Sequence, residues 1–277
     1  MIFLVKKKKN SLLISLTIIT FLVSFYSSAF SSSLKNNFSI PNLTLKTIEE
    51  ESFDSEKYKE KKVSDEFTRV VLIELFLKLG CPPCSVIAPI IEQLAQAYGS
   101  SKIIILEEHI WDSYEISEIA ERYDWYIPLF HQGTPDVLFN GLNQRKQEII
   151  YFYNEYKNIV DVELAKEAKV SISATKEVNN SKIILIGSIK NISFSTLNNL
   201  RIQGMIFENR GEDELHYLVL DVLKGQEVKS FKPGEIIKFT FSSKELNWLT
   251  ENKVHGVIFV QSPDSPTKEI LQAFYVE

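Results

Sequence analysis

The sequence predicts two folded parts: an α/β domain over residues 67–160 and an all-β domain over residues 168–277. Strand-like and helix-like runs alternate in the first part, which is typical of a layered α/β fold. Seven short β-rich runs follow one another in the second part. The chain has 277 residues, of which 44% are hydrophobic, and this is enough for two ordinary domains with buried cores.

The first 29 residues have the layout of a signal peptide. Lys6–Lys9 form a basic start, Leu12–Phe25 an apolar stretch and Ser27–Ala29 a small-residue cleavage site. We therefore expect export, with cleavage after Ala29. The alternative is an uncleaved anchor that associates the protein with a membrane, because the apolar stretch is almost long enough to span a bilayer. Residues 30–66 are rich in Ser, Asn, Lys and Glu, which predicts a polar tether.

Charge and cysteine content narrow the class of protein. The formal net charge is −5, and it becomes −9 without the first 29 residues, which contain four lysines and no acid. Such an acidic chain is a poor partner for nucleic acid or anionic lipid. An exported protein whose two cysteines both lie in one short motif has no disulfide framework to hold its fold together.

The first domain is predicted to alternate strands and helices. A β-branched and aliphatic run precedes a segment with apolar residues at helical spacing, and a second short apolar run follows. This order indicates a right-handed βαβ unit. In chain order we expect strands at Val70–Phe76, Lys102–Leu106 and Val137–Phe139, helices at Cys84–Tyr98 and Tyr114–Tyr123, a turn at Gly141, and a closing helix or hairpin plus helix over Lys146–Tyr156.

Two cysteines stand between the first strand and the first helix, in the motif Cys81-Pro82-Pro83-Cys84. Cys81 is expected at the helix N-terminus, where unpaired backbone N–H groups and the helix dipole stabilise a thiolate. Cys84 lies one turn further on, within disulfide reach. Pro82 and Pro83 fit the first helical turn, where their missing N–H groups cost little, and they stiffen the pair.

These motifs resemble the thioredoxin superfamily over about residues 67–157. Cys84–Ile91 is similar to the active-site helix of that family, including Pro89, which kinks it. Gly133-Thr134-Pro135 and the following strand are similar to its cis-proline loop. The resemblance implies a thioredoxin-like domain in which a cis Pro135 packs against the cysteines and the Thr134 backbone pairs with an extended substrate.

Two positions depart from the family pattern. Many members have an aromatic residue directly before the first cysteine, where this chain has Gly80, and a buried acid six residues before it, where this chain has Leu75. The neighbouring Glu74 is expected to point to the opposite face of the strand. Proton transfer to Cys84 is therefore expected to use water or a group that the sequence does not identify.

The second domain is predicted to be an antiparallel, immunoglobulin-like sandwich. Its seven runs are separated by Asn, Gly, Pro and Ser turns, and no cysteine bridges its sheets. The runs are Val170–Ser173, Lys182–Ile189, Leu200–Phe207, Tyr217–Val222, Ile236–Phe241, Val254–Val260 and Ile270–Tyr275. A signal, a thioredoxin-like domain and a β-rich domain in this order resemble the exported bacterial family of twenty-eight-kilodalton outer-membrane proteins, as do the stretches His109–Tyr114 and Val257–Phe274.

Other polar and aromatic residues are weaker candidates for a site. The four histidines share no ligand spacing with the cysteines, and no second cysteine pair completes a zinc site, so we expect no metal. His131 precedes the proline loop and either approaches the cysteines or lies on a surface loop. Four aromatic residues either line a substrate groove or belong to the core and its rim. They are Trp111, Tyr123, Trp125 and Tyr126.

The sequence thus predicts an exported thiol–disulfide oxidoreductase, located in the periplasm, at the outer membrane or outside the cell. Its partners would be protein thiols and disulfides and a redox partner that the sequence does not name. It needs no cofactor beyond the Cys81–Cys84 pair, of which Cys81 attacks and Cys84 resolves the mixed disulfide. A plain structural disulfide would add little stability across so short a loop. The alternative is a redox-inactive binding or scaffold protein of the same compartment.

Overall fold

The computed structural model describes residues 68–147, 152–179, 181–210, 216–246 and 253–277, which belong to one compact unit. The predicted signal peptide and tether lie outside these residues. Within the described ranges, no helix combines the length and the apolar character that crossing a bilayer requires. In chain order the elements are β1 (Val71–Leu77), α2 (Cys84–Tyr98), β2 (Ile103–His109), α3 (Ser117–Tyr126), η1 (Leu129–His131), β3 (Asp136–Phe139), β4 (Gln144–Lys146), α4 (Tyr153–Leu164), β5 (Val170–Asn179), β6 (Lys182–Asn191), β7 (Leu197–Glu208), β8 (Leu218–Phe231), β9 (Ile236–Ser242), β10 (Val254–Gln261) and β11 (Ile270–Val276).

The structure is β-rich, and most predicted elements are present. Helix α2 has the predicted bounds, and all seven β-rich runs of the second half are strands. Strand β2 continues three residues beyond the predicted end at Leu106, and α3 begins at Ser117 rather than Tyr114. The segment after Gly141 is a hairpin strand followed by a helix, one of the two arrangements predicted for Lys146–Tyr156, but the strand begins at Gln144 and the helix continues to Leu164.

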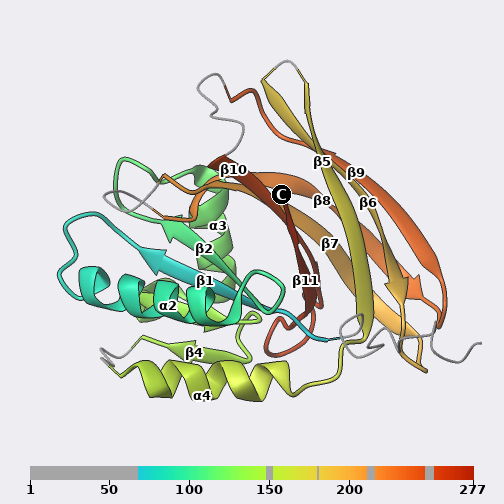
Figure 1. Cartoon of the computed structure of the whole chain (residues 1–277), viewed down its shortest axis with the longest axis horizontal. Helices are drawn as coiled ribbons and strands as arrows, with labels where there is room; N and C mark the ends of the chain where they lie inside the picture. The colour runs from blue at the N-terminus through green and yellow to red at the C-terminus, as the bar shows by residue number, and fades with distance from the viewer. Residues whose placement is uncertain (1–67, 148–151, 180, 211–215, 247–252) are drawn as a thin grey trace, which may run out of the picture. The chain divides into compact units, whose positions relative to one another are not determined.

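Strands from both predicted domains share one eight-stranded sheet with the order β11-β10-β7-β8-β2-β1-β3-β4 (Figure 1). Strands β1 and β2 are parallel, as predicted for a βαβ unit, and β3 and β4 add antiparallel strands. The two halves of the sheet meet where Glu107 of β2 pairs in parallel with Leu218 of β8. One sheet contains strands from both sides of residues 160–168. The division into two domains there stays a prediction.

A second sheet, with the order β5-β6-β9, packs against the C-terminal half of the large sheet. All pairings among the seven C-terminal strands are antiparallel, as predicted. Their inward side chains form one apolar core, which includes Leu185, Ile202, Phe231 and Ile258. Apolar packing therefore holds the two sheets together.

Helices cover both faces of β1, and this explains why all seven of its residues are buried. On one face, α2 and α4 pack their apolar side chains, such as Ile87 and Val160, against Leu75. On the other face, α3 packs Tyr123 and Tyr126 against residues that include Phe76. Glu74 points toward α3, which confirms the predicted orientation, because its carboxylate binds Arg122.

A buried polar network surrounds this ion pair. Arg122 Nε donates to Glu74 Oε1 over 2.5 Å, and the Tyr126 hydroxyl donates to Glu74 Oε2 over 2.9 Å. Gln261 of β10 donates to the Tyr126 hydroxyl over 2.6 Å. Burial, followed by the charge of Glu74, raises the pKa of the adjacent Glu108 well above its usual value. The network joins α3 and β1 to the C-terminal strands.

The first described residues bond to the last strand. Arg69 Nη2 donates to the carbonyl oxygen of Ile270, and the Val70 N–H donates to Gln272 Oε1, both over 2.8 Å. Arg69 also pairs with Glu269. The large sheet thus bends so that β11 returns to the start of β1.

Candidate functional site

Cys81 and Cys84 form a disulfide where β1 passes into α2, with their Cα atoms 5.3 Å apart. The turn between strand and helix contains Gly80, whose φ of +68° lies in the left-handed region that side chains disfavour. An aromatic residue at this position would strain the backbone. The turn conformation therefore favours glycine directly before Cys81.

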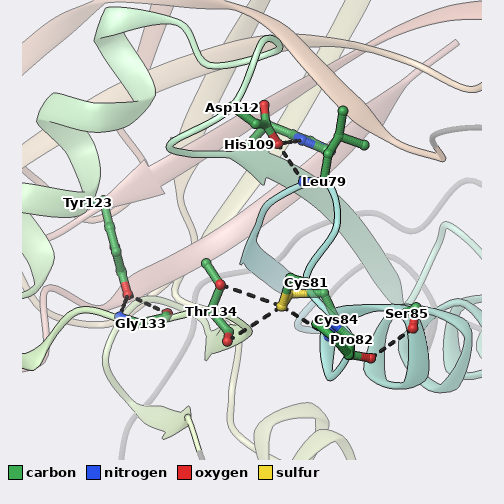
Figure 2. The surroundings of a disulfide bond; sticks show 10 residues. All are labelled: Leu79, Cys81, Pro82, Cys84, Ser85, His109, Asp112, Tyr123, Gly133 and Thr134. Atoms are coloured by element: carbon green, nitrogen blue, oxygen red, sulfur yellow. Dashed lines mark hydrogen bonds and ion pairs between the residues drawn. A yellow bond between two sulfur atoms is a disulfide. The ribbon is translucent and has the colours of Figure 1, made fainter.

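The start of α2 points a hydrogen-bond donor at Cys81 (Figure 2). The Cys84 N–H donates to Cys81 Sγ over 3.3 Å. Pro82 and Pro83 have no N–H, so Cys84 offers the first donor of the turn. The Ser85 hydroxyl donates to the Pro82 carbonyl oxygen over 2.8 Å and fixes the turn. A Cys81 thiolate would be stabilised by this N–H and by the helix dipole.

The peptide bond between Thr134 and Pro135 is cis, as the resemblance implied. Thr134 Oγ1 donates to Cys81 Sγ over 3.5 Å, and the Thr134 carbonyl oxygen lies 3.6 Å from the same sulfur. Both cysteines are buried, since Cys81 is 7% and Cys84 4% exposed. Their contacts differ, since the Cys81 sulfur is the one that meets Thr134.

Tyr123 and Asp136 hold the proline loop through hydrogen bonds. The Tyr123 hydroxyl accepts from the Gly133 N–H over 2.9 Å and lies 2.8 Å from Asp136 Oδ2. Arg145 binds both carboxylate oxygens of Asp136, and its Nη2 also donates to the His131 carbonyl oxygen. Burial raises the pKa of Asp136, although hydrogen bonds from Arg145 and Tyr123 oppose this shift. These contacts fix Thr134 beside Cys81.

Asp112 binds the turn that precedes Cys81. Its Oδ2 accepts from the Leu79 N–H and from His109 Nδ1, both over 2.7 Å (Figure 2). Its Oδ1 accepts from the Tyr114 N–H over 2.8 Å. Burial acts to raise the pKa of Asp112, but these three hydrogen bonds outweigh it and hold the pKa below its usual value. The segment after β2 thus anchors the turn that precedes Cys81.

Glu107 of β2 is a buried acid that the sequence did not single out. It lies beside Leu75 in the register of β1 and β2, so it shares the face of the sheet on which Leu75 packs with α2. Burial, followed by repulsion from Glu92, raises the pKa of Glu107 well above its usual value. Glu107 is thus a buried acid next to Leu75 on the neighbouring strand. Two glutamates directly after an apolar run were its only signal in the sequence.

The remaining candidates are divided between core and surface. Pro89 lies inside α2 and is exposed, and His131 is exposed on η1, which matches the surface alternative. Tyr123 and Tyr126 belong to the core, whereas Trp111 and Trp125 are exposed at its rim. The described residues contain no cluster of three or more His, Cys, Asp or Glu side chains that would hold a metal ion.

Comparison with known proteins identifies a solved structure that has the same fold. No protein-family model and no curated protein matches this chain. It is similar to the solved structure of HBP35 of Porphyromonas gingivalis, with 13% identity and a TM-score of 0.62 over 76% of this chain and 75% of that chain. A domain of the outer membrane lipoprotein Omp28 from Porphyromonas gingivalis matches with 22% identity and a TM-score of 0.30 over 40% of this chain and 88% of that chain. The thioredoxin Deadhead of Drosophila melanogaster matches with 22% identity and a TM-score of 0.25 over 34% and 81%. The similarity to HBP35 shows that the two proteins share a fold.

Proposed function

We propose that this protein is an exported thiol–disulfide oxidoreductase that acts on protein dithiols and disulfides through Cys81 and Cys84. The observation that carries the proposal is the disulfide at the start of α2, in contact with the cis Thr134–Pro135 loop. We include in this proposal a thioredoxin-like region from β1 to α4 and an immunoglobulin-like region from β5 to β11. The basic and apolar N-terminal sequence supports export to the cell envelope.

The reaction is two successive thiolate–disulfide exchanges. The Cys81 thiolate attacks one sulfur of a substrate disulfide, a mixed disulfide forms, and the other substrate sulfur leaves as a thiolate. Cys84 then loses its proton and attacks Cys81 Sγ, which releases the second substrate thiolate and closes the Cys81–Cys84 disulfide. Two electrons pass from the cysteine pair to the substrate, and the reverse sequence oxidises a substrate dithiol.

Glu107 is our candidate for the group that receives the proton of Cys84, through a water molecule. Its raised pKa supports this role, because a carboxyl group that titrates closer to neutral pH exchanges protons with a thiol more readily than an ordinary carboxyl group. Its position beside Leu75, on the side of the sheet that faces α2, also supports it.

The reduction potential of the cysteine pair tests the proposal. The purified protein is equilibrated with glutathione and dithiothreitol buffers, and its free thiols are trapped and counted. A value near or above about −230 mV favours oxidase or isomerase activity, and a value near about −270 mV favours reductase activity. Cys84→Ser should accumulate mixed disulfides with partner proteins, and Cys81→Ser should accumulate none. A potential well below about −300 mV would make the disulfide structural and contradict the proposal.

A second candidate function is ligand binding without redox chemistry, and a large groove favours it. The groove has a volume of about 790 Å³ and lies where β5 and β11 face each other. Its lining includes Ser101, Ala174, Lys176, Gln272 and Tyr275, and neither cysteine. This candidate predicts that ligand binding is unchanged in a variant that lacks both cysteines. Ready cycling of the cysteine pair in glutathione buffers would count against it.

A further inference from the structure

The segment between β2 and α3 holds Trp111 in an unfavourable backbone conformation. Its φ is +61°, in the left-handed region that a bulky side chain rarely adopts. Hydrogen bonds on both sides maintain it, because the Trp111 N–H donates to Glu115 Oε2 over 2.6 Å and the next residue, Asp112, accepts from Leu79. Such strain persists only where the surroundings impose it, and it concentrates at functional sites.

This segment is tied to both sides of the disulfide. Asp112 binds the backbone of Leu79, two residues before Cys81. The Trp111 ring lies 6.2 Å from the Tyr123 ring, and the Tyr123 hydroxyl holds Gly133, the residue before Thr134. Trp111 is therefore fixed relative to the two chain segments that meet at Cys81 Sγ.

The Trp111 side chain is nevertheless half in solvent. It is 50% exposed, and the Lys78 ammonium group lies 5.9 Å from the centre of its ring. The chain segments around the disulfide expose other apolar side chains as well, namely Leu79 before Cys81, Val86 after Cys84, and Phe130, which is 96% exposed and precedes the proline loop. Exposed apolar side chains in the segments that surround a reactive site favour the binding of another molecule there.

We propose that Trp111 is a specificity-determining residue of the Cys81–Cys84 site, and that it selects polypeptide substrates with an apolar side chain beside the reacting cysteine. The inference rests on the proposed thiol–disulfide exchange. In the mixed disulfide, the substrate chain lies between Cys81 and the exposed indole face, which buries apolar surface on both partners. A small disulfide such as glutathione disulfide has no apolar side chain to place there.

The test compares two substrates in one assay. The reduced protein is mixed with glutathione disulfide, or with a peptide disulfide that carries leucine on both sides of the cysteine, and kcat/KM is measured for each. We expect Trp111→Ser to lower the ratio of peptide to glutathione kcat/KM by about tenfold. Trp111→Phe should retain most of the ratio. Phe194→Ser is the matched control, because Phe194 is 99% exposed on the segment between β6 and β7, and it should leave the ratio unchanged.

A third variant separates function from folding. Trp111→Gly loses the same ring as Trp111→Ser but relieves the backbone strain, so it should unfold at a higher urea concentration than Trp111→Ser while its ratio of peptide to glutathione kcat/KM falls equally. Equal losses on both substrates, or an unchanged ratio in Trp111→Ser, would overturn the inference and leave the proposed function intact. Failure of the wild type to react with either disulfide would overturn both.

Discussion

Replacing Arg122 with methionine tests whether the buried network holds the two halves of the structure together. Arg122→Met removes the guanidinium that binds Glu74 and the Tyr126 hydroxyl. It keeps an apolar chain against the rings of Tyr126 and Phe259, whose centres lie 4.8 and 5.2 Å from Arg122 Cζ. The variant therefore removes charge and hydrogen bonds while it preserves most of the packing.

The expected loss follows from the burial of both partners, which are almost inaccessible to solvent. Two unit charges about 4 Å apart attract each other by about 4 kcal/mol at an effective dielectric constant of about 20. Removal of one partner of a buried pair typically costs about 3–5 kcal/mol, because the other charge remains buried without compensation. We expect Arg122→Met to lose an unfolding free energy in this range, which is a large share of the about 5–15 kcal/mol typical of a folded protein.

Urea unfolding at pH 7, followed by circular dichroism and by tryptophan fluorescence, measures this loss. The double variant Glu74→Gln/Arg122→Met should regain about 2–3 kcal/mol relative to Arg122→Met, because no buried charge remains unpaired. Lys157→Met is the control, since Lys157 pairs with Asp161 at the exposed surface, and it should leave stability unchanged. A loss below about 1 kcal/mol in Arg122→Met, or a double variant whose loss equals the sum of the single losses, would refute the reasoning.

Three further predictions concern the surroundings of the disulfide. Gly80→Ala should cost about 1–2 kcal/mol in urea unfolding, because alanine is strained at a φ of +68°; no loss would contradict the turn conformation. Tyr123→Phe removes the hydroxyl that holds Gly133, so it should cost about 1–2 kcal/mol and slow exchange with peptide disulfides; normal values of both would show that the loop needs no such support. Glu107 has a raised pKa in the folded state, so its contribution is complete below about pH 4.3 and falls by up to about 1.4 kcal/mol per pH unit as the pH rises toward the folded pKa. Relative to Glu107→Gln, the wild type should therefore lose stability from pH 4.5 to 7.5, whereas parallel pH profiles would refute the shift.

The sequence predicted the bounds of an element best where the spacing of its apolar residues was regular up to both ends. Helix α2 was predicted from end to end, because its apolar spacing begins after two prolines and stops before Gly99, which has a φ of +76°. Strand β2 was predicted too short because Glu107, Glu108 and His109 are polar, and only tertiary contacts permit their burial. Helix α3 begins later than predicted because Asp112 binds the backbone of Tyr114 and draws the first residues of the run into a loop.

The cysteine pair and the cis proline could be predicted from the sequence, because each lies in a short continuous motif. The contacts of Asp112 with Leu79, and the position of Glu107 beside Leu75, join residues about 30 positions apart. Strand register and a folded turn create such contacts, and a period-two or helical pattern carries no information about them. The continuity of the large sheet was equally hidden, because it depends on one parallel bridge between Glu107 and Leu218.

The bonds from Arg69 and Val70 to β11 have a consequence for how the chain acquires its structure during synthesis. These partners lie about 200 residues apart, so the first strand cannot complete its contacts until residues 269–272 have left the ribosome. Contacts between such distant residues slow folding and leave apolar strands exposed for longer. The contacts that close the start of β1 onto β11 can therefore form only after almost the whole chain has been synthesised.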